Sequence, residues 1–457
     1  METELLEIGE RTVRKAEQLG ADEVEAYLVS SKSISIDVKN NFINSAAIKR
    51  DKGCGIRSVI RKTIGYAYVT SVLEQDIFRV AEKSVALAKA AVPDPDFVGL
   101  PSYKGSYHSI DGLIDKKIVD LRSEEAADII KRTVEATKDA VGGMKVAVEA
   151  KITSNHMTRA VVNSLGISKL EESTFVSLYS EPTVKTSDSQ TSSYEFQVSR
   201  DLKEIDPNWI GKTAGENAIK LFNPKTVENA EMTLLLSPLA LFTIIGRGFG
   251  EAINAEEIQY GRSYISDAIG ESLASEELHI VDDALRIKGV GSRIFDAEGF
   301  PSQRTEIIKD GILKSVLHNS YTANKEEVNN TGNANRPSYF GVPFISPSNL
   351  VISPGQGTQE DLISEIDKGI FCRDTGDRPN MTTGDLSAMV MEGFYIEKGE
   401  IKFPVKNTLF GLHMRDLLKK LKRVGKDSRV ITNVFDPKFT VISPSIVIES
   451  AKITSGE

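Results

Sequence analysis

The chain has 457 residues, 40% of them hydrophobic and 26% charged, which is typical of an ordinary folded protein and excludes a disordered or collagen-like one. Its formal net charge of −9 repels a phosphate backbone, so we expect no nucleic-acid partner. The two cysteines, Cys54 and Cys372, are too few for a disulfide framework or for a zinc site built from the thiolates of one chain.

The sequence predicts neither a membrane span nor a secretory signal. The apolar stretch at 234–245 contains Ser237 and Pro238, and it is shorter than the roughly 20 residues that cross a bilayer. The N-terminal segment is acidic and amphipathic, whereas a secretory signal is basic and then continuously apolar. We therefore expect a protein of the cytoplasm that does not contact a membrane.

The N-terminal part of the chain predicts a domain of helix, sheet and helix, to which we assign residues 1–102. Side chains at 33–39 alternate between polar and apolar, as they do in a strand with one buried face. The predicted elements, in chain order, are a helix at 3–19, strands at 24–29 and 33–39, a hairpin of strands at 52–60 and 65–70, and a helix at 74–92.

Residues 103–224 form the second predicted domain, a central α/β region. Gly142-Gly143 ends its long helix, and Asn223-Pro224 marks the main domain border. The predicted elements are a helix at 115–140, three short strands within 145–181, a mobile polar loop at 186–193, a strand at 194–198 and a helix at 209–222.

The third predicted domain, residues 225–457, has short strands separated by turn signals such as Asp310-Gly311. We expect one interior helix at 358–368 and an amphipathic helix at 412–423, whose basic outer face we interpret as a solvated surface. The predicted fold class is α+β, with an N-terminal α/β region whose helices pack on a sheet and a C-terminal, mostly antiparallel β domain.

A glycine cluster, Gly246-x-Gly248-x-Gly250, follows an apolar run. A dinucleotide-binding loop would continue into a long helix and then into a strand that ends in an acidic residue. Asn254 and Gly261 interrupt the sequence that follows the cluster, so we do not interpret the cluster as a nucleotide site.

The five histidines do not form a local metal motif, because no two of them stand three to five residues apart. The sequence leaves open an unfamiliar metal site made by distant residues, in which Glu251 or Glu256 would take part. The serine-hydrolase pattern G-x-S-x-G does not occur, so nucleophilic catalysis has no support.

Two turns carry side chains that could take part in catalysis or binding. Asp296 and Glu298 are a carboxylate pair that would suit acid and base catalysis if buried, although a solvated turn is the favoured interpretation. The loop at 329–337 has backbone amides and Arg336, which could hold a peptide backbone or a carboxylate, and a turn capped by asparagine side chains explains it equally well.

Several segments occur in the order and spacing of one known family. They are Gly53-Cys54-Gly55-Ile56-Arg57, Asn163-Ser164-Leu165-Gly166, Gly261-Arg262-Ser263 to Gly270-Glu271, Val281-Asp282-Asp283, Asp296-Ala297-Glu298-Gly299, Thr331-Gly332-Asn333-Ala334-Asn335-Arg336, Ser346-Pro347-Ser348-Asn349-Leu350 and Thr383-Gly384-Asp385-Leu386-Ser387. On these segments the chain resembles the TldD/TldE family of metallopeptidases, whose TldE branch is also called PmbA and modulator of DNA gyrase.

The resemblance implies that this chain lacks the family's zinc ligands. Members of the TldD branch carry H-E-x-x-x-H where this chain has residues 246–251, so Gly246 replaces the first ligand, Arg247 the glutamate base and Glu251 the second ligand. The third ligand is a cysteine in a C-G-K-like segment, where this chain has Val424. In an ideal α-helix, side chains five residues apart diverge by about 140°, so such a site needs a distorted helix.

The function implied by the resemblance is that of a TldE/PmbA-like subunit without catalytic or metal-binding residues. It would form a heterodimer with a TldD-like subunit that holds the zinc, or a homodimer with itself, and the complex would cleave small or unfolded peptides. The segments at 246–257, 331–336 and 383–387 would line the remnant of the cleft. The candidate peptide-binding residues are Glu256, Thr331, Asn333, Asn335, Arg336, Thr383, Gly384 and Asp385.

Two alternatives remain open. The first is a homodimeric peptide-binding or scaffold protein that has no peptidase partner. The second is an active hydrolase with an atypical metal or carboxylate site around Glu251, Asp296 and Glu298.

Overall fold

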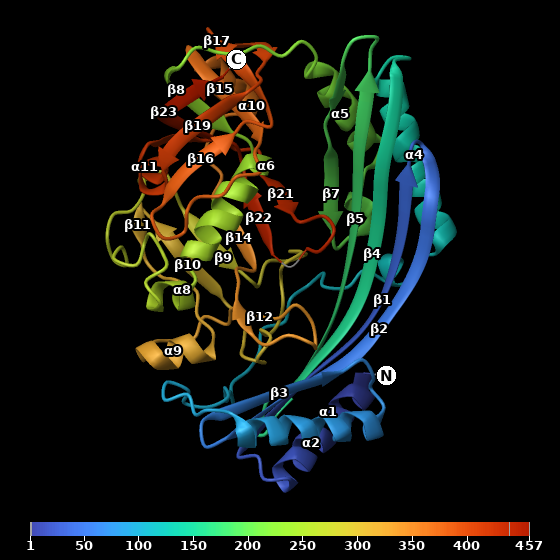
Figure 1. Ribbon diagram of the computed structural model, residues 1–457. Coiled ribbons are helices and arrows are strands. Elements are labelled where there is room, and N and C mark those ends of the chain that lie inside the picture. The colour runs from blue at the N-terminus through green and yellow to red at the C-terminus, as the bar shows by residue number, and fades with distance from the viewer. Residues whose placement is uncertain (1, 438, 457) are drawn as a thin grey trace.

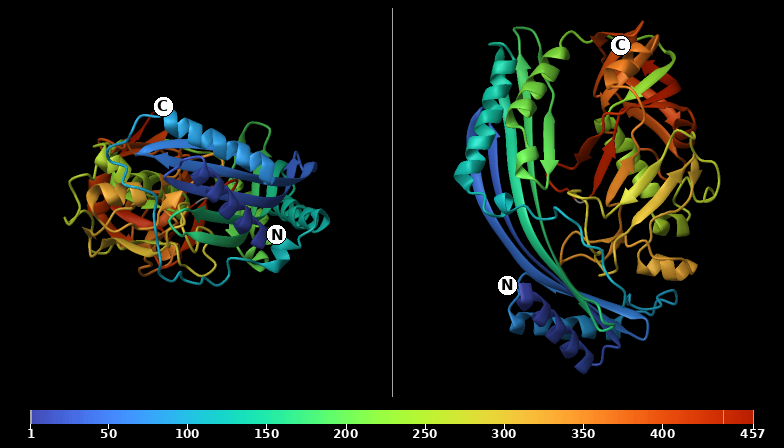
Figure 2. Two further views of the ribbon diagram at one scale, coloured as in Figure 1. Left: turned by 90° about the horizontal axis from the view of Figure 1, so that it is seen from below. Right: turned by 180° about the vertical axis from the view of Figure 1, so that it is seen from behind.

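The computed structural model describes residues 2–437 and 439–456. It consists of a long, strongly curved sheet and a C-terminal half that lies against the concave side of this sheet (Figure 1). Seen from behind, the long strands bend around the C-terminal half, and helices cover the convex side (Figure 2). The expected α+β class is confirmed.

The curved sheet is antiparallel throughout, with the strand order β3-β2-β1-β4-β5-β6 and with β7 paired to β5. Its strands are β1 (Glu23–Lys39), β2 (Phe42–Ile60), β3 (Thr63–Val69), β4 (Lys145–Asn163), β5 (Ser168–Lys185), β6 (Gln190–Ser192) and β7 (Glu195–Ser199). The helices of this part are α1 (Glu2–Gln18), α2 (Glu74–Ala90), α3 (Lys116–Val119), α4 (Ser123–Ala140) and α5 (Pro207–Lys220), with a 3₁₀ turn at Leu202–Glu204.

The two faces of the curved sheet have different partners because side chains alternate along each strand. On β1, Ala26 and Leu28 belong to the core that α1 and α2 cover, and Ile36 belongs to the core that α4 and α5 cover. Their neighbours Tyr27 and Val29 point the other way and pack with residues of the C-terminal half. One strand therefore contributes to three hydrophobic clusters, two on the helix-covered face and one on the face towards the C-terminal half.

The C-terminal half contains two larger sheets that share one hydrophobic core. The eight-stranded sheet consists of β8 (Ala230–Leu236), β15 (Lys368–Asp374), β16 (Asp385–Met389), β17 (Glu392–Glu397), β18 (Glu400–Pro404), β19 (Thr408–His413), β20 (Leu421–Val424) and β23 (Ile446–Ser455). The six-stranded sheet consists of β9 (Ile280–Asp283), β10 (Arg304–Lys309), β11 (Ile312–Leu313), β14 (Asn349–Ile352), β21 (Arg429–Thr432) and β22 (Thr440–Ser443).

Shorter elements connect these sheets. The strands β12 (Ala334–Asn335) and β13 (Phe344–Ile345) form a small ladder of their own. The helices are α6 (Pro238–Leu241), α7 (Gly250–Ala252), α8 (Ala255–Gln259), α9 (Ser320–Glu326), α10 (Gln359–Ser364) and α11 (Met414–Lys419), and a π-helix occupies Phe242–Phe249. Most strand pairs are antiparallel, but β8 with β15 and β14 with β22 are parallel.

Several sequence-based boundaries are wrong. The region expected to hold three short strands holds two long ones, because Asn155 and His156 continue the ladder between β1 and β5 instead of forming a turn. The helix expected at 115–140 is divided into α3 and α4. The expected basic helix at 412–423 is only the short α11, and the chain after it extends into β20.

Other expected elements are shorter than the sequence suggests. The helix expected at 358–368 is limited to α10, whose first turn is capped by Thr358. The polar segment at 186–193, expected to be a mobile loop, contains the edge strand β6.

The predicted domain borders at 102/103 and 224/225 fall between α2 and α3 and between α5 and β8. The curved sheet contains strands from both sides of the first border. The borders stay predictions.

Within the part of the chain that the structure describes, no helix is long and apolar enough to cross a membrane.

Candidate functional site

The segment aligned with the family's metal motif lies in an irregular helix. Ser237 caps its start by accepting hydrogen bonds from the N–H groups of Leu239 and Ala240. The helix then widens into the π-helix at Phe242–Phe249, and the N–H of Gly250 donates to the carbonyl of Ile245, five residues earlier. Since a π-helix has more residues per turn than an α-helix, side chains five apart come closer to one face. The distorted helix that the motif spacing requires is therefore present.

The residues on this helix do not fit a zinc ion. A Cβ atom at Gly246 would lie under 3.0 Å from Cγ2 of Val441, so the first ligand position has no space for a side chain in this packing. Arg247 is exposed and cationic. Glu251 is exposed and forms an ion pair with Arg378, with 3.1 Å between Oε2 and Nη1. Zinc needs neutral or anionic N, S or O ligands at short range, and this set does not supply them.

The remaining candidate ligands also lie elsewhere. Val424 is buried in β20, where it pairs with Ile446 of β23. Burial raises the pKa of the Cys54 thiol to about 12 and that of Cys372 well above its ordinary value, so both cysteines stay protonated. Across residues 2–437 and 439–456, no group of three or more His, Cys, Asp or Glu side chains is arranged to hold a metal ion.

The turn that contains Thr383, Gly384 and Asp385 lies beside the same helix. The loop that leads into it contacts the helix twice, because Arg378 pairs with Glu251 and a Cβ at Gly248 would lie 2.6 Å from Pro379. Both segments were predicted to line one cleft, and the structure places residues 378 and 379, which precede the turn, against the helix.

Internal hydrogen bonds fix the shape of this turn. The hydroxyl of Thr383 donates to Asp385 at 2.7 Å, and its carbonyl lies 2.7 Å from Nε2 of His413. Gly384 has φ +81°, which favours glycine, and a Cβ there would lie 2.8 Å from the same His413 nitrogen. Thr383 and Asp385 are exposed at the surface. After the motif helix, α8 places Glu256 in a half-buried position two residues beyond Asn254, which caps α8.

The side chains of Thr331 and Asn333 form hydrogen bonds to other segments of the C-terminal half. The hydroxyl of Thr331 accepts a hydrogen bond from the N–H of His318 and donates one to its carbonyl, at 2.7 and 3.0 Å. Asn333 is 1% exposed and donates from Nδ2 to Asp282 at 2.7 Å and to the carbonyl of Ser346. These bonds correspond to the interpretation of the loop as a turn fixed by side-chain caps.

Asn335 and Arg336, at the end of the same loop, face the curved sheet instead. The guanidinium of Arg336 lies 4.8 Å from the ring centre of Tyr27 and forms an ion pair with Glu25 through Nη2. Nε and Nη1 of Arg336 and Nδ2 of Asn335 are buried and have no hydrogen-bond partner among the described residues. Both residues line a cavity of about 340 Å³ between the sheet and the C-terminal half.

A buried network of charges joins this loop to the sheet. Glu25 accepts from Arg57 at 2.8 Å as well as from Arg336, and Arg57 also donates to Glu298 at 3.0 Å. Burial by itself raises the pKa of Glu25, but Arg336 and Arg57 outweigh it, so the pKa lies below its ordinary value.

Asp296 and Glu298 are buried and not part of a solvated turn, which corrects the favoured interpretation of this segment. Burial, together with the neighbouring Glu298, raises the pKa of Asp296 to about 7. Glu298 is held by Arg57, whereas Glu251 is exposed and held by Arg378. The three carboxylates therefore have separate partners and are not gathered into one open site.

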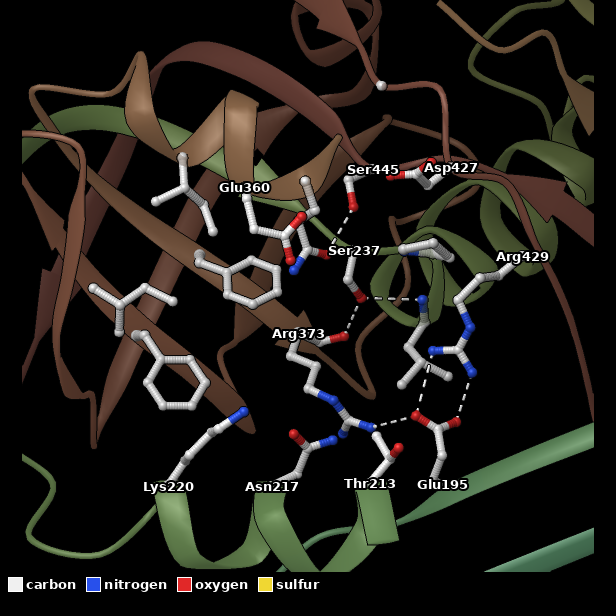
Figure 3. A pocket seen from close by; sticks show the side chains of 18 of the residues that line it. Glu195, Thr213, Asn217, Lys220, Ser237, Glu360, Arg373, Asp427, Arg429 and Ser445 are labelled. Atoms are coloured by element: carbon white, nitrogen blue, oxygen red, sulfur yellow. Dashed lines mark hydrogen bonds and ion pairs between the residues drawn. The ribbon is translucent and has the colours of Figure 1, made fainter. Parts of the chain in front are cut away.

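A larger cavity, of about 780 Å³, was not predicted (Figure 3). It lies between α5 and β7 on one side and the C-terminal half on the other. Figure 3 shows Glu195 between Arg373 and Arg429, and its carboxylate oxygens lie 3.3 and 2.6 Å from their Nη2 atoms. Trp209 and Phe394 add apolar surface. Because the lining comes from many separate stretches of chain between Glu195 and Ser445, no local sequence pattern indicates this cavity.

Three family models match the chain. They are PmbA/TldA metallopeptidase domain 1 over residues 24–88, the PmbA/TldA metallopeptidase central domain over 116–222 and the PmbA/TldA metallopeptidase C-terminal domain over 229–455.

Individual relatives are similar over most or part of the length. A metalloprotease PmbA homolog from Haemophilus influenzae is 25% identical over 99% of this chain and 96% of its own length. A metalloprotease from Methanothermobacter thermautotrophicus is 30% identical over 52% of each chain. The crystal structure of TldE from Thermococcus kodakarensis has a TM-score of 0.88 and 25% identity, covering 98% of this chain and 100% of that one.

Proposed function

Because the chain belongs to the PmbA/TldD family of metallopeptidases, we propose that it is the TldE/PmbA-like subunit of a cytoplasmic peptidase complex that acts on small or unfolded peptides. In this complex a TldD-like subunit supplies the zinc ion and its ligands. This chain supplies a wall of the peptide-binding chamber and no catalytic residue.

The observation that carries this proposal is the packing of the motif helix. The helix has the widened turn that a motif with ligands five residues apart needs, but Gly246 packs against Val441 and Arg247 adds a positive charge where the family has a base. A cation next to a metal site opposes metal binding, because like charges repel. The likeness to TldE of Thermococcus kodakarensis supports the assignment to the TldE side of the family.

Cleavage assays with separated and mixed subunits test the proposal. The purified chain, a TldD-like subunit from the same source and their mixture would each be incubated with a short unfolded peptide, with and without a chelator. We expect no cleavage by this chain alone and chelator-sensitive cleavage by the mixture. Chelator-sensitive cleavage by this chain alone would instead support the hydrolase with an atypical site.

The same assay separates the proposal from a scaffold protein without a peptidase partner. If the chain neither associates with the TldD-like subunit nor changes its activity, the heterodimer is excluded and the homodimeric scaffold becomes the better account. Co-elution of the two chains from a sizing column is the matched physical measurement.

A further inference from the structure

The cavity of about 340 Å³ lies where the concave face of the curved sheet meets the C-terminal half. β1, β4 and β5 provide one wall, and the segments at 290–293, 335–338 and 435–437 provide the other. The sheet wall exists because alternate side chains of these strands point away from the covering helices. It is separate from the helix with the degenerate metal motif.

Four buried arginines line this cavity: Arg159, Arg200, Arg293 and Arg336. The acidic residues in the lining are Glu171 and Asp436. Glu171 forms an ion pair with Arg159, with 2.9 Å between Oε1 and Nη2. Arg336 is paired with Glu25 behind the lining, so Arg200 and Arg293 are the arginines of the lining for which no ion pair with a carboxylate is found among the described residues. Burial weakens the screening of their charge by water.

Arg200 keeps its charge without a carboxylate. Its three nitrogen atoms donate five hydrogen bonds to backbone carbonyls, and burial lowers its pKa only to about 10, so it remains protonated at neutral pH. The acceptors are the carbonyl oxygens of Leu113, Thr174, Gly289, Val290 and Ser292. Arg200 therefore adds a fixed positive charge to one side of the cavity.

Arg293 and Arg336 have buried donors without a hydrogen bond of ordinary geometry in the described chain, and the Tyr66 hydroxyl lies beside the Arg336 guanidinium. Nε and Nη2 of Arg293 and Nε and Nη1 of Arg336 are buried without a hydrogen-bond partner, as is Nδ2 of Asn335. Arg293 is 6% exposed and Arg336 4%. A buried guanidinium N–H without an acceptor is costly, so these groups favour a ligand that brings negatively charged oxygen atoms.

The remaining lining residues indicate which chemical groups the rest of that ligand would carry. Beside the charged groups, the lining combines serine, threonine and asparagine side chains with three larger apolar ones, Met157, Phe175 and Phe435. The volume is at the lower end of the range of about 300–1,000 Å³ that is usual for small-molecule sites. An anion attached to an apolar side chain fits this lining better than a bare inorganic ion, since the apolar wall would then be covered.

We propose that this arginine-lined cavity binds the C-terminal carboxylate of a peptide whose last side chain is apolar, with Arg293 and Arg336 donating to the carboxylate. The planar fork of a guanidinium matches the two oxygens of a carboxylate. The assignment of the ligand as a peptide rests on the proposed function. The cavity thus anchors the C-terminal end of a peptide.

Titration calorimetry of the full chain alone tests this inference without any peptidase activity. The probes are acetyl-Ala-Ala-Phe with a free carboxylate, the same peptide as its C-terminal amide, and inorganic phosphate. We expect the free acid to bind at least about tenfold more tightly than the amide, because charged hydrogen bonds are lost with the amide. We also expect phosphate to bind more weakly than the acid.

Variants locate the site. Arg293→Gln should weaken binding of the acid at least about tenfold, whereas Arg304→Gln, which removes an exposed arginine on β10, should leave it unchanged. Equal affinities for acid and amide, no saturable binding of the acid in the millimolar range, or unchanged binding by a folded Arg293→Gln chain would each overturn the inference. Phosphate that binds as tightly as the acid would overturn the peptide assignment.

The comparison of acid with amide uses the unaltered chain, so the inference remains testable if Arg293→Gln does not fold. Failure of the cleavage assay in the mixture of subunits would remove the proposed function but leave this binding measurement as it stands.

Discussion

Glu25 lies on β1 of the curved sheet, between Arg57 and Arg336, and all three side chains are almost fully buried. Removal of one member of a buried charge network leaves the others without a counter-charge, and this costs about 3–5 kcal/mol. We therefore expect Glu25→Gln to lower the free energy of unfolding by about that amount, as measured by denaturant titration at pH 7.

The control for this prediction is Glu306→Gln, because Glu306 forms an exposed pair with Lys309 at 3.3 Å and should contribute little. The pKa of Glu25 lies below its ordinary value of 4.5, so its stabilising effect is complete above about that pH and is lost as the pH falls through the lower native pKa. Equal losses in both variants at pH 7 would contradict the account of the network.

Asp296 predicts the opposite dependence on pH. Its pKa is raised from 3.8 to about 7, so the folded protein retains a proton that the unfolded chain has already lost over this interval. The stability that comes from this proton is complete below about pH 3.8 and is lost as the pH rises towards 7.

Asparagine does not titrate, so the stability of Asp296→Asn relative to the unaltered chain should rise between pH 5 and pH 8, as measured by denaturant titration at each pH. A difference between the two chains that does not change with pH would show that Asp296 is ionised throughout.

Single residues were partly predictable from sequence. Arg336 was foreseen as a group that could hold a carboxylate, because it follows a run of asparagines and threonine in a loop. Its partner was not foreseen, since Glu25 is separated from it by 311 residues. Thr331 and Asn333 lie in the same loop as Arg336, but their side chains form hydrogen bonds within the C-terminal half. The sequence did not indicate this difference.

At the scale of elements, the helix at 238–252 predicts a clear effect of side-chain volume. Gly246 packs against Val441 of β22, and an added Cβ would overlap it. Forcing extra atoms into a packed interior costs about 1–3 kcal/mol, so Gly246→Ala should lower the melting temperature.

Gly411→Ala is the matched control. A Cβ at Gly411 would have only ordinary contacts, at 3.9 Å or more, and alanine is favoured over glycine within a strand. The control should therefore be neutral or slightly stabilising. If Gly246→Ala were equally well tolerated, the position would have room for a side chain, and the argument against a ligand there would fail.

Elements were predictable where one pattern decides them. The alternation at 33–39 identified the end of β1, and the apolar spacing at 3–19 identified α1. The length of β4 was missed because Asn155 and His156 are residues of the kind that form turns, while in the structure two neighbouring strands satisfy their backbone. The motif spacing indicated that a metal site here would need a distorted helix, but no local pattern in the sequence predicted the bounds of the π-helix at Phe242–Phe249.

At the scale of the whole molecule, Glu195 joins the curved sheet to the C-terminal half. Its carboxylate on β7 binds Arg373 of β15 and Arg429 of β21, and its side chain is 2% exposed. We expect Glu195→Gln to loosen this junction, so that hydrogen exchange of β21 becomes faster while that of α1 does not change. Glu400→Gln removes an exposed ion pair with Lys402, and it should change the hydrogen-exchange rates of neither β21 nor α1.

An unchanged exchange rate of β21 in Glu195→Gln would mean that apolar contacts alone hold the two parts together. The cluster of Phe196, Leu239, Ile431 and Val434 is the structure that would then carry the junction.

The claim that this chain leaves zinc to a partner is tested most directly by the zinc content of the purified chain and of its complex with a TldD-like subunit, measured by elemental analysis after dialysis. The account predicts no bound zinc in this chain alone and one zinc ion for each TldD-like subunit in the complex. Stoichiometric zinc in this chain alone would contradict it, because a metal site would then exist that the packing around Gly246 and the positions of Arg247, Glu251 and Val424 do not provide.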